Sequence, residues 1–271
     1  MRDWGRQATA LVLAGKRAGT IDPLAAAAGT ELKCLVPVAG EPMIAHVLGA
    51  LAASPLIGRI LVSVNDAPAL AAVPQVDALV RGGRLVLLPA HGDLASSVLA
   101  AVAGATYPVL ITTADNVLLT PAAVSAFVAN ADDQRADVAV AFASREAVLA
   151  AHPDGQRRFY RFADGAFSNC NLYWIGHAGA LGAVEVFRRG GQFAKHPGRI
   201  VHAFGVFNLI RFRLGVGTLR AAFARFSRRF GFAMRAVIVA DGALAIDVDN
   251  ERTLRIAEEL LRERQEAIAA E

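Results

Sequence analysis

The sequence predicts an α/β protein in which helices cover a mostly parallel sheet. Over the first 145 residues, short apolar runs alternate with segments whose apolar residues recur at three- and four-residue steps. Hydrophobic residues make up 55% of the 271 residues, which fits strands buried on both faces of a sheet. The two cysteines imply no disulfide framework, so a reducing, cytoplasmic setting is expected.

Five strands and four helices are predicted in this first part. The strands are expected at Leu11–Leu13, Arg59–Val64, Arg84–Leu88, Tyr107–Thr112 and Ala136–Ala143. The helices are expected at Met43–Ala53, Ala67–Val73, Ser96–Ala103 and Pro121–Asn130. Thr120 is the expected N-cap of the last of these helices, and either Asp93 or Ser96 is expected to cap the helix before it.

The alternation ends after His152. An antiparallel hairpin is predicted from Arg157–Phe162 and Ala166–Trp174 around an Asp-Gly turn. The remaining elements are expected to be a helix at Ala178–Arg188, strands at Ala236–Val239 and Ala243–Val248, and a final helix at Thr253–Ala269. No signal peptide and no transmembrane helix is expected.

A glycine turn follows the first predicted strand. Gly15, Lys16, Arg17 and Gly19 form this turn, and Lys33 follows later. Backbone N–H groups and cations at the end of a strand can hold phosphate, so the turn suggests a nucleotide ligand. Neither the dinucleotide fingerprint nor the P-loop pattern is present, which leaves an ordinary turn as the alternative.

Three aspartates follow apolar runs. Asp115 comes directly after a predicted strand, and Asp247 and Asp249 form AIDVDN near the C-terminus. Magnesium prefers a few carboxylates together with water and phosphate oxygens, so these residues are candidate Mg²⁺ ligands. The alternative is that Asp115 caps a loop and Asp247 caps the final helix.

The segment from Gly92 to Ser97 precedes a predicted helix. Its small polar residues and the helix N–H groups can read a base edge or hold phosphate. A simple helix cap is the alternative.

Positive charge and phenylalanine are concentrated late in the chain. Residues 186–240 contain eleven Lys or Arg, no Asp or Glu, and nine of the 14 Phe, although the net charge of the whole chain is only +4. Within this block, Thr218–Phe230 has the pattern of a basic amphipathic helix. Three interpretations stay open: an ordinary surface helix, an anionic membrane surface contacted through 186–235, or an anionic acceptor site that includes Arg211 or Arg213. Nucleic-acid binding is not expected, because the rest of the chain is acidic.

The ordered motifs LAG…R-x-G…K-x-L-x-P-V-x-G-x-P-M-I, GD…SSV, TADN and DVDN…L run from Leu11 to Leu254. Together they resemble the nucleotidyltransferase superfamily with a GT-A-like fold. Its members include molybdenum-cofactor nucleotidyltransferases, methylerythritol-phosphate cytidylyltransferase and sugar-phosphate nucleotidyltransferases. The resemblance implies a Rossmann-like three-layer α/β/α fold with a small acceptor-binding insertion.

The resemblance also implies roles for individual residues. The triphosphate would lie on the turn Ala14, Gly15, Lys16, Arg17 and Gly19, with Arg17 and Lys33 catalytic. Mg²⁺ would be held by Asp115 and Asp249, with Asp247 in an outer position. The base would be read by Gly92, Asp93, Ser96 and Ser97, which favours CTP over GTP. The chain departs from the family pattern in its shorter turn, in Ala18 where the family has Met, and in the Ala-rich insertion Ile21–Glu31.

The implied reaction is transfer of NMP, with CMP favoured, from an NTP to a phosphorylated small-molecule acceptor with release of pyrophosphate. One domain, 1–271, is expected, with a nucleotide-binding part (1–145), an acceptor-binding part (146–240) and a C-terminal part with the second metal ligand (241–271). Acceptor contacts are expected from Arg158, Asn171, Arg211 and Arg213. The alternatives are a GT-A glycosyltransferase that uses a nucleotide sugar and a non-catalytic nucleotide-binding protein at a membrane surface. The expected location is the cytoplasm, including the inner face of the membrane.

Overall fold

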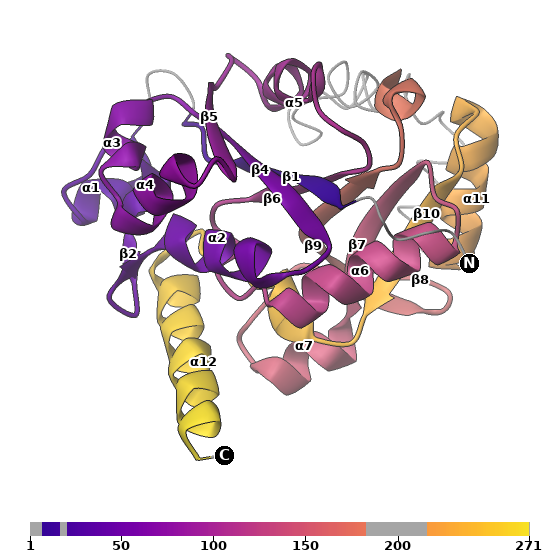
Figure 1. Cartoon of the computed structure of the whole chain (residues 1–271). Helices are drawn as coiled ribbons and strands as arrows, with labels where there is room; N and C mark the ends of the chain where they lie inside the picture. The colour runs from indigo at the N-terminus through magenta and orange to yellow at the C-terminus, as the bar shows by residue number, and fades with distance from the viewer. Residues whose placement is uncertain (1–6, 17–20, 183–215, 271) are drawn as a thin grey trace.

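The structure is a computed structural model that describes residues 7–16, 21–182 and 216–270. An eight-stranded sheet runs through the described part, with helices on both faces (Figure 1). Seven strands follow the order β10-β7-β9-β6-β1-β4-β5, and β8 pairs with β9. The strands are β1 (Ala8–Leu13), β4 (Ile57–Val64), β5 (Leu85–Pro89), β6 (Val109–Thr113), β7 (Val138–Ser144), β8 (Tyr160–Phe162), β9 (Gly165–Ile175) and β10 (Met234–Val239).

The direction of the strands confirms the predicted mixed, mostly parallel sheet. Strand β9 runs antiparallel to β6, β7 and β8. The other pairs, β1–β4, β1–β6, β4–β5 and β7–β10, are parallel. The carboxyl ends of β1, β4, β5, β6 and β7 therefore lie at one edge, where ligands of open α/β sheets bind.

Two layers of helices bury the faces of the sheet, as the three-layer fold requires. Val12 of β1 points to one face, where it shares a core with Leu48 of α2 (Met43–Ala53) and Phe127 of α6 (Pro121–Asp133). Leu11 points to the opposite face and shares a second core with Val98 of α5 (Leu94–Val102) and Phe223 of α11 (Leu219–Phe230). This alternation follows from the two-residue period of a strand.

The helices on these layers vary widely in length. They are α1 (Pro23–Ala27), α2 (Met43–Ala53), α3 (Ala67–Ala71), α4 (Pro74–Arg81), α5 (Leu94–Val102), α6 (Pro121–Asp133), α7 (Arg145–Ala151), α11 (Leu219–Phe230) and α12 (Glu251–Ala269). Short 3₁₀ turns are η1 (Lys33–Leu35), η2 (Ala178–Leu181) and η3 (Gly242–Ala245), and β2 (Pro37–Val38) pairs with β3 (Glu41–Pro42). The predicted helix at Ala178–Arg188 begins as η2, and its residues from 183 onward lie outside the described residues.

Local capping chemistry sets several helix starts. The Asp93 carboxylate accepts a hydrogen bond from Ser96 N (2.9 Å), and Thr120 Oγ1 accepts one from Ala123 N (3.1 Å). The caps predicted at Asp93 and Thr120 are therefore confirmed. The alternative cap at Ser96 is wrong, because Ser96 lies inside the first turn of α5.

The strand predicted at Ala243–Val248 is wrong. Gly242–Ala245 form the 3₁₀ turn η3, in which Asp241 accepts a hydrogen bond from Ala243 N (2.9 Å). The turn packs tightly, since a Cβ at Gly242 would lie 2.1 Å from the Ala147 carbonyl oxygen of α7. A short buried apolar run has no period that separates a strand from a buried turn, which explains the error.

Strand β9 contains a bulge beside the edge where ligands bind. Val140 pairs with Tyr173 and Phe142 pairs with Asn169, so residues 170–172 lie opposite Ala141 alone. Asn171 takes a left-handed backbone conformation there, with φ of 47°. Asparagine tolerates this region better than most residues, and a bulge re-aims the side chain that it carries.

Candidate active site

Three side chains from distant parts of the chain meet beyond the carboxyl end of β6. Lys33 lies on η1, Asp115 follows β6, and Asp249 precedes α12. Lys33 Nζ donates hydrogen bonds to Asp115 Oδ2 (2.7 Å) and to Asp249 Oδ1 (2.8 Å). The side chains of Lys33 and Asp115 are 22% and 20% exposed, whereas that of Asp249 is 67% exposed. The cluster therefore has an inner and an outer carboxylate that share one ammonium group.

The lysine is held in its charged form. Burial by itself would lower the pKa of Lys33, but the attraction and hydrogen bonds of Asp115 and Asp249 outweigh burial and raise that pKa. An ammonium group has three donors, and two are used by these carboxylates. Lys33 thus brings a fixed positive charge and one further donor to this position.

A third carboxylate, Asp247, lies beside this cluster. Its Oδ2 accepts a hydrogen bond from Asn171 Nδ2 (2.7 Å), the side chain that the β9 bulge re-aims. Burial, together with the charges of Asp115 and Asp249, raises the pKa of Asp247 to about 8. The hydrogen bond from Asn171 and the charge of Lys33 act in the opposite direction but are outweighed.

Two carboxylate oxygens at this site have no hydrogen-bond partner within the described part of the chain. Asp115 Oδ1 and Asp247 Oδ1 are both buried and unpaired. A buried acceptor without a partner is costly, by about 1–3 kcal/mol. An ordered water, an ion or a ligand can supply the missing partner of such a group.

Backbone contacts fix the last of these segments against the first. Val248 N donates to the Asp115 carbonyl oxygen (3.1 Å), and Asp249 N donates to Thr253 Oγ1 (2.9 Å). Asn250, not Asp247, caps α12 and forms a capping box with Thr253. The alternative in which Asp247 caps the final helix is therefore wrong, and its carboxylate is left to face the cluster.

Asn171 is itself held by a short chain of hydrogen bonds. Tyr173 Oη donates to Asn171 Oδ1 (3.2 Å), and Asn169 Nδ2 donates to Tyr173 Oη (2.7 Å). Burial raises the pKa of Tyr173 to about 12, so its hydroxyl stays protonated and can act as this donor. The chain fixes the amide of Asn171 so that its NH₂ group points to Asp247.

The residues at this site fit a magnesium ion. Two carboxylates share one ammonium group, a third carboxylate lies beside them, and two buried oxygens lack partners in the described part of the chain. Within the described residues no group of three or more His, Cys, Asp or Glu is placed to hold a metal ion. This suits Mg²⁺, which takes one or two carboxylates and completes its octahedron with water and substrate phosphate.

The glycine turn lies on the other side of Asp115, at the ends of β1, β4 and β5. A Cβ at Gly15 would lie 2.8 Å from Ala90 Cβ and 3.3 Å from Asn65 Oδ1, so this position needs glycine. Lys16 N donates to Asn65 Oδ1 (2.5 Å), and Ala14 N donates to the Ser63 carbonyl oxygen (2.9 Å). These two N–H groups are therefore already used within the chain. Arg17 and Gly19, predicted in the same turn, lie outside the described residues.

Lys16 does not join the carboxylate cluster. Its Nζ pairs with Glu31 Oε2 at 2.6 Å, and the Glu31 side chain is 77% exposed. Ion pairs this exposed contribute about 1 kcal/mol or less. A phosphate at the turn can therefore compete for Lys16 at small cost.

The predicted base-reading segment, 92–97, begins close to the residue that packs against the glycine turn. Ala90, which approaches Gly15, is followed by His91 to Ser97, and Gly92 has no atom within 4 Å of an added Cβ. Asp93 and Ser96 are hydrogen-bonded to each other, with Ser96 Oγ 2.6 Å from Asp93 Oδ2. Ser97 is buried and holds the loop by accepting from His91 N (2.9 Å).

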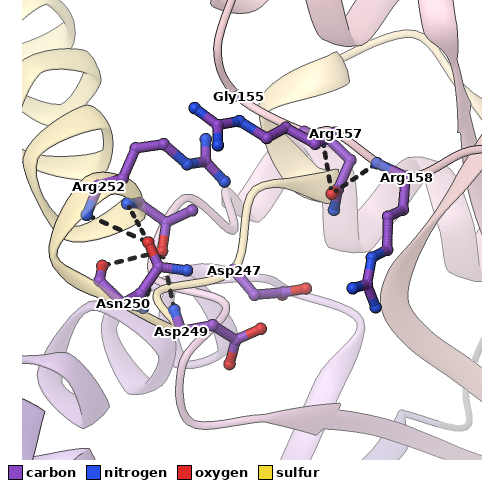
Figure 2. A pocket seen from close by; sticks show the side chains of 9 residues that line it. Gly155, Arg157, Arg158, Asp247, Asp249, Asn250 and Arg252 are labelled. Carbon is purple, nitrogen blue, oxygen red and sulfur yellow. Dashed lines mark hydrogen bonds between the residues drawn. The ribbon is translucent and has the colours of Figure 1, made fainter. Parts of the chain in front are cut away.

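Of the predicted acceptor residues, Asn171 and Arg158 are near the cluster. Asn171 contacts Asp247 directly. Figure 2 shows Arg158 in the same pocket as Asp247 and Asp249. Arg211 and Arg213 lie outside the described residues, as does most of the basic block.

Comparisons with known proteins identify the family of the chain. The family described as "MobA-like NTP transferase domain" matches residues 10–195, which is more than half of the chain. The chain belongs to this family. It is a nucleotidyltransferase, which sets aside the glycosyltransferase and non-catalytic alternatives.

Solved structures share the fold over nearly the whole chain. A hypothetical transferase from Thermus thermophilus is 28% identical with a TM-score of 0.76, and the match covers 92% of this chain and 99% of that one. CMP:2-keto-3-deoxy-manno-octonic acid synthetase in complex with CTP is 14% identical with a TM-score of 0.56, over 95% and 100% of the two chains. Rv0371c from Mycobacterium tuberculosis H37Rv is 17% identical with a TM-score of 0.54, over 94% and 98%. No curated protein matches the chain.

Sequence reasoning missed several residues at the site. Asn65 directly follows β4, as Asp115 follows β6, so the same strand-end rule would have found it. Arg157 and Arg252 line the pocket beside Arg158. No sequence pattern indicates that Arg252 lines this pocket, because its position depends on how α12 docks against a loop 98 residues earlier in the chain.

Proposed function

We propose that this nucleotidyltransferase moves an NMP group, with CMP favoured, from an NTP to a phosphorylated small molecule and releases pyrophosphate. The observation that carries this proposal is the convergence of Lys33, Asp115 and Asp249 at 2.7 and 2.8 Å, with buried carboxylate oxygens left unpaired. An arrangement with excess negative charge near a glycine turn that carries Lys16 is suited to a divalent cation and a triphosphate.

In this proposal Asp115 and Asp249 hold Mg²⁺, with Asp247 behind them. When bound, Mg²⁺ supplies charge that polarises the α-phosphate and favours the attacking oxygen. Lys33 bridges the two carboxylates and offers its third donor to a phosphate oxygen. Arg17 and Lys16 offset negative charge on the departing pyrophosphate. Positioning and charge neutralisation supply most of the acceleration, since no nucleophile of the chain is required.

The preference for CTP rests on the segment Gly92, Asp93, Ser96 and Ser97. This segment begins two residues after Ala90, whose Cβ lies against Gly15 of the glycine turn. The synthetase that shares this fold was solved with CTP, which is consistent with the preference. Arg158 and Asn171 are proposed to contact the acceptor, and Arg211 and Arg213 are proposed to assist.

The decisive experiment is a screen for pyrophosphate release. Four nucleoside triphosphates are tested against a panel of phosphorylated acceptors, with and without Mg²⁺. We expect release that requires Mg²⁺ and is highest with CTP. Asp115→Asn should reduce release by about 100-fold or more while the variant stays folded. Asp133→Asn, an exposed aspartate at the end of α6, is the matched control and should behave as wild type. Near-normal turnover of Asp115→Asn would overturn the assignment.

We also propose that the basic face of α11 contacts an anionic membrane surface. Leu219, Ala222 and Phe223 of this helix are buried, while Arg220 and Arg228 are exposed. In the described part of the chain no helix is both long and apolar enough to cross a bilayer. Surface binding is tested by liposome sedimentation: retention on anionic but not neutral vesicles supports it, and no retention removes it. The two free, buried cysteines suit a reducing compartment, which we propose is the cytoplasm.

A further inference from the structure

A cavity of about 490 Å³ opens beside the carboxylate cluster. Residues 155–158 form one wall, and the floor and the other wall are formed by Asp247, Asp249, Asn250, Arg252 and Thr253. In the view of Figure 2, Asp247 and Asp249 lie between the segment that carries Arg157 and Arg158 and the start of α12. The cavity therefore has an acidic floor and basic walls, which is suited to a ligand with an anionic group.

The loop that carries the two arginines is fixed to the segment before Asp247. Gly155 packs against Ile246 so closely that a Cβ there would lie 2.5 Å from Ile246 Cδ1. Gln156 Nε2 donates to the Ala245 carbonyl oxygen (3.4 Å), and Arg252 Nη1 donates to the Asp154 carbonyl oxygen. The loop is thus fixed at three successive residues, 154–156, by contacts with the segment 245–252.

Gln156 also organises the backbone of both arginines. Its Oε1 accepts hydrogen bonds from Arg157 N (2.9 Å) and Arg158 N (3.2 Å), as the dashed lines in Figure 2 show. A backbone fixed before binding reduces the ordering cost that a ligand must overcome. The two guanidinium groups consequently start from one defined turn of the chain.

The positive charges of Arg157 and Arg158 are not neutralised by ion pairs within the described part of the protein. Neither Arg157 nor Arg158 forms an ion pair with a described carboxylate, although Asp247 and Asp249 line the same cavity. Both arginines are exposed. Guanidinium groups bind phosphate with paired, planar hydrogen bonds, and two of them match the charge of a phosphate monoester.

The position of the cavity separates it from the phosphates of the nucleotide. Gly15 and Asn65 follow β1 and β4, which lie on one side of β6. The cavity borders Asp247, which Asn171 of β9 contacts on the other side of β6. Asp115, at the end of β6, lies between the two regions.

We infer that Arg157 and Arg158 bind the phosphate monoester of the acceptor in this cavity, beside Asp247 and Asp249. A phosphate oxygen held there would attack the α-phosphorus of the NTP while the bond from that phosphorus to pyrophosphate breaks. This inference rests on the proposed function and adds to it the two residues that would recognise the phosphate group of a small acceptor. A cavity of about 490 Å³ suits a small molecule.

The inference is tested with inorganic phosphate as the probe, measured by isothermal titration. Phosphate is titrated into wild type, Arg157→Gln, Arg158→Gln and the double variant, each with and without Mg²⁺ and a non-hydrolysable CTP analogue. Arg262→Gln, an exposed arginine further along α12 and outside the cavity, is the matched control. Thermal melting of each variant verifies that it is folded.

We expect wild type and Arg262→Gln to bind phosphate equally well with the CTP analogue present. Each single substitution should weaken binding by about threefold or more, and the double substitution by about tenfold or more. Unchanged binding by the double variant, displacement of phosphate by the CTP analogue, or no binding by wild type would overturn the inference. The titration needs no turnover, so a failed pyrophosphate screen with intact arginine-dependent phosphate binding would locate the fault in the proposed function alone.

Discussion

The carboxylate cluster and the start of α5 both place acidic side chains at the ligand-binding edge of the sheet, but the hydrogen-bond partners of their carboxylate oxygens differ. At the start of α5, Asp93 is bonded to both the backbone and the hydroxyl of Ser96. In the cluster, Asp115 and Asp247 each keep a buried oxygen without a partner in the described part of the chain. A carboxylate that is hydrogen-bonded within its own helix start serves the fold first, whereas a buried carboxyl oxygen without a hydrogen-bond partner points to a ligand.

The largest expected effect in the cluster comes from removing its cation. Lys33→Met should reduce pyrophosphate release by about 100-fold or more, because the ammonium group holds both carboxylates and faces the phosphates. The free energy of unfolding should fall by about 1–3 kcal/mol, since two carboxylates lose their charged partner. Steady-state kinetics and urea denaturation measure the two effects. Wild-type turnover in this variant would mean that the cluster is only structural.

The second prediction concerns the pH dependence of stability. The pKa of Asp247 is raised to about 8 in the folded protein, above the usual value of 3.8. The folded state therefore holds a proton that the unfolded state has lost between these values. The free energy of unfolding should fall with rising pH in this window, by about 1.4 kcal/mol per pH unit for this one group, and level off above pH 8.

Urea denaturation of wild type and Asp247→Asn at several pH values between 5 and 8 tests this prediction. The difference in unfolding free energy between the two proteins should depend on pH with that slope. Added Mg²⁺ should flatten the slope in wild type, because a bound cation favours the ionised carboxylate. Parallel pH profiles of the two proteins would show that Asp247 titrates normally.

The smallest effects are expected at the start of α5. Asp93→Ala should lower the free energy of unfolding by about 1 kcal/mol through loss of the helix cap. Ser96→Ala keeps that cap and should change stability by less than about 0.5 kcal/mol. If this segment reads the base, Ser96→Ala should still reduce the preference for CTP over GTP by about threefold in competition assays. An unchanged nucleotide preference would assign the segment to helix capping alone.

Much of the fold could be predicted from local signals in the sequence. The helix Met43–Ala53 has the predicted bounds, and Thr120 and Asp93 cap the helices that they precede. Asp115 was placed at the end of a strand because ITTADN follows an apolar run. These features depend on residues within one or two turns of each other, where side-chain period and capping chemistry are decisive.

Other features depended on contacts between distant segments. The sequence could not show that β9 inserts antiparallel between β6 and β7, or that its bulge aims Asn171 at Asp247. The buried run at Ala243–Val248 was mistaken for a strand, because burial against α7 leaves no period in the sequence. Arg252 joined the pocket only through the docking of α12.

The sequence by itself determined where the strands, the helix caps and the charged residues lie along the chain, because these follow from periodicity and from bonds between near neighbours. Only the tertiary structure brought Lys33 within 2.8 Å of a carboxylate 216 residues later and left two oxygens nearby without partners. The reason is physical: strand order and helix docking are set by packing between distant segments, and the charge balance of a site exists only after that packing has formed.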